Sequence, residues 1–262
     1  MPPVACHPLD EGLRIELQPI FELLPEGRRL YAFECLARGV KGGAFERAEM
    51  LFQEVRRRRK EGSMDRSCLS AALREASRLS GEPHLCVNIH AKTLSTDAGF
   101  LADFARITAA HEISPARLTL EIVEHTASWA TRLFHRNLEA LRQLGVSLSI
   151  DDFGIGYSNL HRLLECRPDF CKIERYFVAG CDGDPRRSDI LEAVTQLVHR
   201  FAARVIAEGI ETTAELALVA AVGIDLVQGF LLSPPLPADR FHAGELLGES
   251  VFPSSLRERN AP

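Results

Sequence analysis

Short apolar segments recur along the chain, and each one places a polar residue at or just after its carboxyl end. The clearest is segment 146–150, in which apolar residues alternate with serines and which leads directly into Asp151 and Asp152. An alternation with a period of two predicts a β-strand whose successive side chains point to opposite faces. It places Ser149 and Asp151 on the face opposite to Ile150. The polar residues delivered in this way are Gln18, Glu34, Asn88, Glu121, Asp151, Lys172, Glu208 and Gln228.

Helical periodicity separates most of these strands. It is found over residues 63–80, 97–111, 128–144, 186–202 and 212–222. Alternating β and α units favour a parallel sheet, and about eight strands suffice to close one. We therefore predict an α/β fold, a modified TIM-type (β/α)8 barrel whose N-terminal strand is irregular. In such a barrel the chemistry lies at the carboxyl ends of the strands.

Composition is consistent with a single barrel domain. The 262 residues contain no linker or low-complexity tract, so we assign 11–249 to the barrel and 1–10 and 250–262 to tails. A net charge of −5 gives no broad cationic surface for a DNA or RNA polymer. The longest apolar runs are too short for a membrane span, and the first residues lack the pattern of a signal peptide. Seven cysteines without C-x-x-C spacing are typical of reduced thiols in a cytoplasmic protein.

The polar residues favour a site for hard cations. Adjacent carboxylates such as Asp151 and Asp152 repel each other, so a metal ion or a shared proton is expected between them. Lys172 lies in an apolar strand, where an unpaired ammonium would be costly, and carboxylate partners would remove that cost. The nine histidines are scattered and form no H-E-x-x-H motif, so no zinc constellation competes.

Several of these residues also have structural interpretations. Glu208 could be a solvated surface acid, Asn88 could cap a turn at 90–92, and Gln228 could satisfy buried backbone groups. The cationic run 56–60 is interpreted as the solvated end of a helix, because five consecutive cations do not form a single helical face.

Eight short motifs follow one another along the chain in a fixed order. They are Gln18-Pro19-Ile20, Glu34-Cys35-Leu36 followed by Arg38, Val87-Asn88-Ile89, Leu120-Glu121-Ile122-Val123-Glu124, Asp151-Asp152-Phe153-Gly154-Ile155-Gly156-Tyr157-Ser158-Asn159-Leu160, Lys172-Ile173-Glu174, Ala207-Glu208-Gly209-Ile210-Glu211-Thr212 and Val227-Gln228-Gly229-Phe230. From about Leu13 to Pro237 the chain resembles the bacterial EAL-domain phosphodiesterases, which hydrolyse cyclic di-GMP.

This resemblance implies hydrolysis of cyclic di-GMP to linear 5'-pGpG by a water activated by two metal ions. Mg²⁺ or Mn²⁺ would support the reaction and Ca²⁺ would inhibit it. The implied metal ligands are Glu34, Asn88, Glu121, Asp151, Asp152 and Glu208. The implied catalytic residues are Lys172, which would orient the attacking water, with Glu208, Glu121 and Asp152. The implied substrate-binding residues are Gln18, Leu36, Arg38 and Gln228, with Asp65 as a further candidate for the pocket wall. Glu124 would anchor the glycine-containing loop.

The resemblance also implies a homodimer whose contact lies near Gly156 to Leu160, and regulation by a separate protein is an open option. Three departures from the family pattern bear on rate and loop order, namely Ile155 in place of a threonine, Glu174 in place of an aspartate, and Gly39 after Arg38 where an aromatic residue is common. The main alternative function is a catalytically weak or silent cyclic di-GMP receptor, and a third is a protein-interaction barrel. Retention of Glu34, Asp151 and Lys172 favours the enzyme.

Overall fold

Eight strands close into a barrel in which neighbours in sequence are also neighbours in space, from β1 to β8. The structure is a computed structural model and describes residues 12–123, 131–154 and 159–241, to which all statements below refer. The expected tails, Glu124 and Ile155 lie outside these residues. The strands are β1 (Arg14–Leu24), β2 (Gly27–Arg38), β3 (His84–His90), β4 (Leu118–Val123), β5 (Ser147–Phe153), β6 (Phe170–Ile173), β7 (Arg204–Ala207) and β8 (Leu226–Val227).

β1 runs antiparallel to both of its neighbours, β2 and β8, whereas all the other neighbouring strands pair in parallel. Only two residues, Pro25 and Glu26, connect β1 to β2, which leaves no room for the crossover that a parallel pair requires. The register of β1 against β2 also shifts between Ile20 and Phe21. The predicted barrel with an irregular N-terminal strand is therefore confirmed, and the sheet is parallel except at β1.

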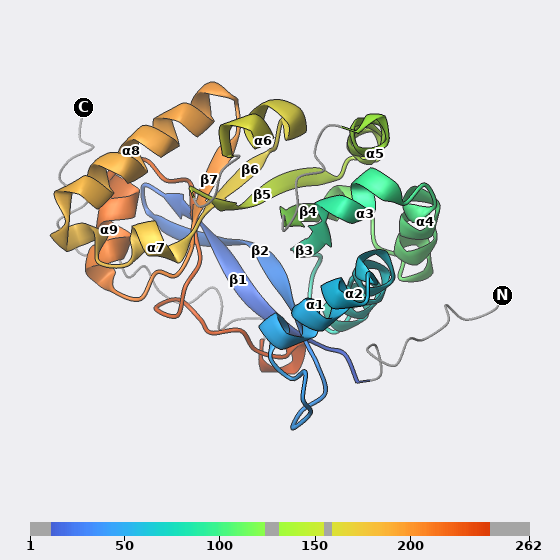
Figure 1. The fold of residues 1–262 in the computed structure, drawn as a ribbon. Helices are drawn as coiled ribbons and strands as arrows, with labels where there is room; N and C mark the ends of the chain where they lie inside the picture. Colours follow the sequence, from blue (N-terminus) through green and yellow to red (C-terminus); the bar gives the residue numbers. More distant parts are fainter. Residues whose placement is uncertain (1–11, 124–130, 155–158, 242–262) are drawn as a thin grey trace.

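Helices fill the remaining connections (Figure 1). They are α1 (Ala48–Arg57), α2 (Glu61–Ala76), α3 (Ala91–Thr96), α4 (Phe100–Ala110), α5 (Arg132–Gln143), α6 (Asn159–Cys166), α7 (Arg175–Val178), α8 (Pro185–Arg200) and α9 (Thr213–Ala221), with 3-10 turns at Pro115–Arg117, Cys181–Gly183 and Ala238–Arg240. The five predicted helices correspond to α2, α4, α5, α8 and α9. The alternative interpretation of Asn88 as the cap of a turn at 90–92 is wrong, because α3 begins at Ala91 directly after β3.

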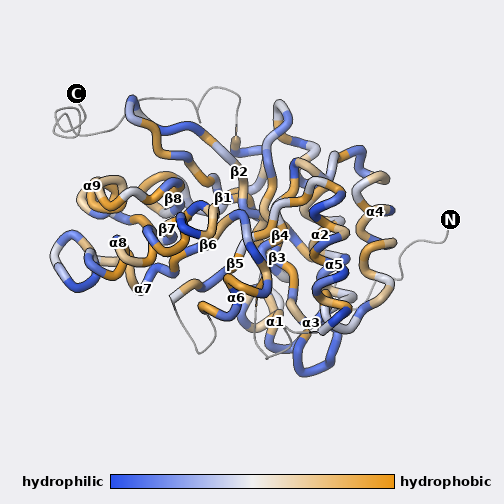
Figure 2. Tube along the Cα trace, turned by 90° about the horizontal axis from the view of Figure 1, so that it is seen from above, coloured by the Kyte–Doolittle hydropathy of each residue, from blue (hydrophilic) through white to orange (hydrophobic). Residues whose placement is uncertain are grey.

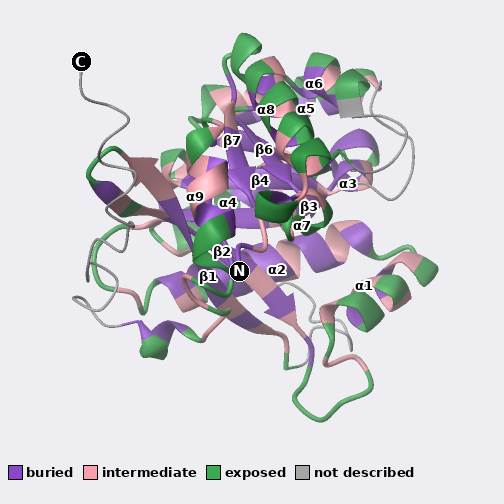
Figure 3. Cartoon of the chain, turned by 90° about the vertical axis from the view of Figure 1, so that its left-hand side faces the viewer, coloured by how far each residue is buried: buried purple, intermediate pink, exposed green. Residues whose placement is uncertain are grey.

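Two apolar cores hold the barrel together. The larger one fills the space between the outer face of the strands and the surrounding helices, where α7, α8 and α9 lie on one side and α2, α3 and α4 on the other (Figures 1 and 2). The smaller one fills the barrel interior. Figure 3 shows the consequence: the strands are mostly buried, and exposed residues are concentrated on the outer helix faces. The interior core consists of Ile20, Ala32, Cys86, Phe170, Ile206 and Leu226, with Tyr31 packed against it.

The interior core fixes where the polar residues lie. In the parallel strands the residue two positions beyond each core residue points to the same face, and it is polar in every case. In β1 the direction is reversed, so the matching residue precedes Ile20. The interior therefore has an apolar layer beneath a polar layer at the carboxyl ends of the strands. The matching residues are Gln18, Glu34, Asn88, Lys172, Glu208 and Gln228.

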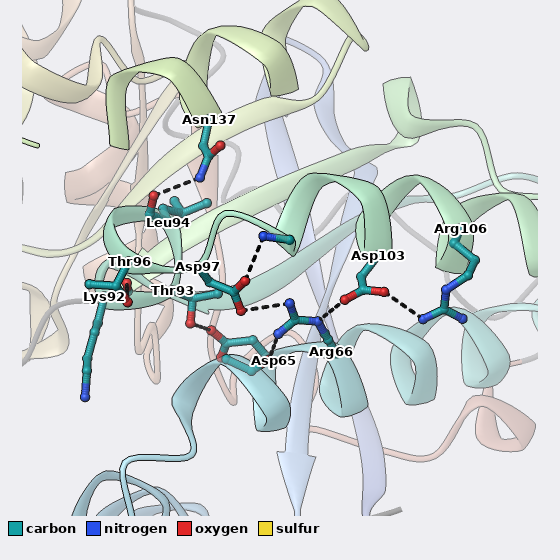
Figure 4. Close-up of polar contacts among 12 residues, drawn as sticks. Asp65, Arg66, Lys92, Thr93, Leu94, Thr96, Asp97, Asp103, Arg106 and Asn137 are labelled. Carbon is teal, nitrogen blue, oxygen red and sulfur yellow. Dashed lines mark hydrogen bonds and ion pairs between the residues drawn. The ribbon is translucent and has the colours of Figure 1, made fainter. Parts of the chain in front are cut away.

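A polar network fixes the helices that follow β3. Arg66 on α2 forms ion pairs with Asp97 (2.7 Å) and Asp103 (2.5 Å), and Arg106 also binds Asp103 (3.0 Å), as Figure 4 shows. Asn137 on α5 donates to the carbonyl oxygen of Leu94 (2.9 Å). These contacts hold α3 against α2 and α5, and with it the carboxyl end of β3.

Candidate functional site

The ammonium group of Lys172 lies at the centre of the polar layer. Its Nζ is 2.8 Å from Glu208 Oε1, 3.1 Å from Glu121 Oε2, 3.2 Å from Glu34 Oε1 and 3.7 Å from Asp151 Oδ1. Lys172 is 1% exposed and Glu121 is fully buried. These carboxylates are the partners that a buried ammonium requires. Five strands, β2, β4, β5, β6 and β7, thus place one charged residue each at the same point.

A break in strand β5 adds the fifth carboxylate. Adjacent residues of a regular strand point to opposite faces, so Asp151 and Asp152 should diverge. The pairing of β5 with β6 instead shifts between Ile150 and Phe153, and Asp152 has a left-handed φ of 54°. A bulge of this kind redirects a side chain. It brings carboxylate oxygens of Asp151, Asp152 and Glu208 within 4.8 Å of one another.

Amide side chains connect the carboxylates to β1 and β8. Gln228 Nε2 donates to Glu34 Oε2 (2.6 Å) and to Gln18 Oε1 (2.8 Å), and Gln18 Nε2 donates to the carbonyl oxygen of Ser233 (3.1 Å). Asn88 Nδ2 lies 3.4 Å from Glu34 Oε1. The amide groups of Gln228 and Asn88 therefore orient Glu34 through their N–H donors, while their acceptor oxygens have no hydrogen-bond partner.

Burial and mutual repulsion perturb the acids. Burial raises the pKa of Glu208 to about 8, with Asp151 and Glu34 adding to the effect of burial and Lys172 opposing it. Burial also raises the pKa of Glu121 well above its ordinary value. The pKa of Glu34 is instead lowered, because Lys172 and the hydrogen bond from Gln228 outweigh its burial. The four carboxylates hold the pKa of Lys172 well above its ordinary value, despite burial, so it stays protonated.

The residues fit hard divalent cations. The acid cluster consists of five carboxylates, those of Glu34, Glu121, Asp151, Asp152 and Glu208, and the Lys172 ammonium contacts four of them. Four negative charges therefore remain among these described residues when all are ionised, and two divalent cations would neutralise them. Three buried acceptor oxygens of the cluster, Asn88 Oδ1, Glu121 Oε1 and Gln228 Oε1, have no hydrogen-bond partner. Carboxylate and amide oxygens are the ligands that Mg²⁺ and Mn²⁺ prefer.

A cavity of about 330 Å³ opens beside the acids, between β2, β3, α1 and α2. Glu34, Asn88, Asp151 and Asp152 form part of its wall, and Leu36, Arg38 and Asp65 also line it. Its volume is at the lower end of the range for small-molecule sites. Every described residue in our set of candidates therefore lies in the polar layer of the barrel interior or in the wall of this cavity.

Arg38 has a partner within the chain, because its Nε lies 3.0 Å from Glu16 Oε2. Asp65 is also engaged: it accepts from the backbone N–H of His90 (3.1 Å) and from Thr93, and its Oδ1 lies 2.7 Å from His90 Nδ1. Asp65 therefore fixes the end of β3 as well as lining the cavity.

Among the residues of the cavity wall that sequence reasoning missed are Phe52, Arg56 and His90. The end of the cationic run is solvated as expected, since Arg57 and Arg58 both pair with Glu54 on the exposed side of α1. Arg56 differs from them by lining the cavity. Its spacing of four residues from Phe52, which places both on one helix face, is the signal that was available.

Other expectations concern residues around the site. Glu174 accepts from the backbone N–H of Tyr176 and so caps the short helix α7. The six cysteines that the structure describes are buried, and burial raises the pKa of Cys171 to about 12. In the part of the chain that the structure describes, we find no helix long and apolar enough to cross a membrane.

The model of the EAL domain family matches residues 8–235 of the chain. The chain belongs to the EAL domain family. A relative from Pseudomonas aeruginosa, the cyclic di-GMP phosphodiesterase NbdA, is 40% identical over 120 residues, or 46% of this chain and 15% of NbdA. MucR of the same organism, a bifunctional diguanylate cyclase/cyclic di-GMP phosphodiesterase, is 33% identical over 61% of this chain and 23% of its own length. This EAL domain thus spans less than a quarter of these two relatives.

Solved EAL structures share the barrel. The PaMucR phosphodiesterase in complex with c-di-GMP has a TM-score of 0.76 and 28% identity, covering 88% of this chain and 94% of that one. Klebsiella pneumoniae BlrP1, in a complex with calcium and cy-diGMP, also has a TM-score of 0.76, with 29% identity over 90% of this chain and 58% of that one.

Proposed function

We propose that this EAL domain hydrolyses cyclic di-GMP to linear 5'-pGpG with the help of two divalent metal ions. The observation that carries the proposal is the cluster of five carboxylates at the wall of a cavity, four of which contact Lys172, together with unpaired amide and carboxylate oxygens. Membership of the EAL family and the names of the relatives support the choice of substrate.

The chain offers two sets of metal ligands. Glu34, Asn88, Glu121 and Asp151 would hold one ion, and Asp151 would share a second ion with Asp152 and Glu208. When bound, the two ions would supply an activated water and stabilise the charge of the phosphodiester. Either Mg²⁺ or Mn²⁺ would support the reaction. Ca²⁺ would inhibit, because it is larger and coordinates less strictly.

Lys172 would act on the water and on the transition state. Its ammonium group is protonated and held by the same carboxylates that bind the ions, so it can donate a hydrogen bond to the attacking water and to the developing phosphorane oxygens without reorganising. Gln228 would hold Glu34 in its binding orientation and present its free oxygen to a bound water.

The cavity would hold the nucleotide. Arg38 and Leu36 follow Glu34 on the same face of β2 and line the same cavity, so Arg38 would contact a phosphate of the nucleotide. Arg38 would then exchange its ion pair with Glu16 for a bidentate contact with the ligand. Gln18 would support Gln228 from β1.

The second candidate function is a cyclic di-GMP receptor without turnover. Loss of metal-binding acids would favour it, but the described residues retain all five, together with Lys172. The enzyme is therefore the stronger proposal.

We also propose that the chain forms a homodimer through α6, within the segment that sequence reasoning placed near Gly156 to Leu160. Of this segment, residues 155–158 lie outside the described residues. Leu160 and Leu164, one helical turn apart, are each 62% exposed. Two large apolar side chains on the outer face of a short helix suit a contact with a second copy. A regulatory protein is the alternative occupant, and sedimentation of the wild-type chain and of Leu164→Glu separates the two.

The test of the reaction is incubation of the chain with cyclic di-GMP in Mg²⁺, Mn²⁺, Ca²⁺ or excess chelator, followed by separation of the products. We expect pGpG with Mg²⁺ or Mn²⁺ alone. Turnover in excess chelator would contradict the two-metal proposal. Nucleotide binding without turnover in any metal would establish the receptor instead.

A further inference from the structure

A side chain outside the acid cluster supports the bulge on which two of the cluster's carboxylates depend. Arg162 lies on α6, and its Nη1 donates to the backbone carbonyl oxygen of Asp151 at 3.0 Å. The residue is only 6% exposed. Burying a guanidinium costs free energy unless the group is hydrogen-bonded, so the hydrogen bond to Asp151 is part of what keeps Arg162 in this buried position.

The position of this hydrogen bond matters because a bulge interrupts the ladder of strand hydrogen bonds. The register of β5 against β6 is lost between Ile150 and Phe153, which includes the carbonyl group that Arg162 binds. This carbonyl belongs to the peptide group that joins Asp151 to Asp152. The hydrogen bond from Arg162 therefore fixes the plane of the peptide that decides how the two carboxylates diverge.

Packing and hydrogen bonds hold α6, the helix that carries Arg162, in place. Leu163 and Cys166 on the inner face of α6 are buried, and α6 packs against β5. The far end of the helix is held by Arg142 on α5, which donates to the carbonyl oxygens of Cys166 and Arg167. His135 on α5 also contacts Glu165, with 2.6 Å between Nε2 and Oε2.

We propose that Arg162 is a positioning residue for metal binding: it holds the Asp151–Asp152 peptide in the conformation that lets both carboxylates face Glu208. This inference rests on the proposed function for the identity of the bound ions. The buried Arg162 and the exposed Leu160 and Leu164 lie on opposite sides of the same helix, so a contact on the outer face of α6 bears on the helix that carries this hydrogen bond. The orientation of the Asp151 and Asp152 carboxylates then depends on how α6 packs against β5.

The experiment compares Arg162→Met with Arg142→Met. Both variants remove an arginine that donates to a backbone carbonyl group and steadies α6, but only the first touches the bulge. The primary readout is the affinity for Mn²⁺ alone, measured by calorimetry on the full chain. Thermal unfolding of both variants in chelator measures their general loss of stability.

We expect Arg162→Met to weaken Mn²⁺ binding by roughly tenfold or more, the range for residues that orient metal ligands, and Arg142→Met to change it less than about twofold. Turnover of Arg162→Met should recover at high Mn²⁺, since Arg162 touches no reacting atom. Arg162→Lys, which keeps the charge but has no planar fork, should fall between the two.

Equal Mn²⁺ affinities of Arg162→Met and wild type, or equal losses in both methionine variants, would overturn the inference. If Arg162→Met does not fold, the same comparison with Arg162→Lys decides. The readout separates this inference from the proposed function: a wild-type chain that binds Mn²⁺ but does not hydrolyse cyclic di-GMP leaves the test in force, whereas a wild-type chain that binds no Mn²⁺ rejects both.

Discussion

Replacing Lys172 by methionine removes the only cation from the acid cluster of the described residues while keeping most of the side-chain volume. Its Nζ lies 2.8–3.7 Å from four carboxylate oxygens. With an effective dielectric constant of about 20, each of these pairs is worth about 4.5–6 kcal/mol of Coulomb attraction before desolvation is counted. Desolvation of the ammonium offsets much of this, and breaking a buried pair by removing one partner costs about 3–5 kcal/mol.

We therefore expect Lys172→Met to lower the free energy of unfolding of the metal-free chain by about 3–5 kcal/mol at pH 9. The loss should be smaller at pH 6, because the freed carboxylates take up protons. In saturating Mn²⁺, turnover should fall by about 10²- to 10⁴-fold, since the group that contacts the attacking water is lost. Affinity for cyclic di-GMP in Ca²⁺ should change much less, because Lys172 acts mainly on the transition state.

The assays are urea unfolding at both pH values, turnover followed by product separation, and calorimetry. Lys92→Met is the matched control, because the half-exposed Lys92 pairs with one carboxylate, that of the buried Glu61, at 2.8 Å and away from the acid cluster. It should cost less free energy of unfolding than Lys172→Met and leave turnover unchanged. Turnover of Lys172→Met within tenfold of wild type, or a loss of affinity as large as the loss of turnover, would refute the assigned role.

Three further predictions concern other parts of the molecule. Arg38→Ala should weaken binding of cyclic di-GMP in Ca²⁺ by about tenfold or more, whereas Arg57→Ala, from the solvated end of α1, should not; equal affinities by calorimetry would exclude Arg38 as a phosphate ligand. In chelator, thermal stability should fall as the pH rises through about 8, because the raised pKa of Glu208 lets the folded chain hold a proton that the unfolded chain has lost; Mn²⁺ should flatten this slope, and identical slopes with and without Mn²⁺ would contradict it. Arg66→Met should cost about 1–3 kcal/mol at pH 7 by urea unfolding. Arg66 and Arg106 hold the pKa of Asp103 below its ordinary value, so this part of the stability is present above that value and is lost in acid; a difference that persists unchanged at pH 2 would argue against the ion pairs.

Much of the fold could be predicted from local pattern. A period of two puts one polar residue beyond each interior apolar residue, and helical periods lie between the strands, so a barrel with its polar layer at the carboxyl ends followed directly. The antiparallel start of the barrel was anticipated only as an irregularity. Its physical cause is the two-residue connection between β1 and β2, which permits only a hairpin.

The sequence of motifs also led to the EAL family, which the family comparison confirms over residues 8–235. It could not tell which cation of the run 56–60 faces the cavity, because that depends on how α1 packs on β2 and α2. Nor could it predict that Asp65 would be engaged by His90 and Thr93, since those contacts join helices and strands that are far apart in the chain.

The sequence by itself determined which chemistry was available: acids, amides and one lysine at the ends of apolar strands, because side-chain alternation is a local property of the backbone. Only the tertiary structure decided how these groups meet. Strict alternation would separate Asp151 from Asp152, and a bulge in β5 brings them together. The four carboxylates reach the Lys172 ammonium from four other strands, so closure of the barrel, rather than any local pattern, creates the excess of negative charge that two divalent cations would neutralise.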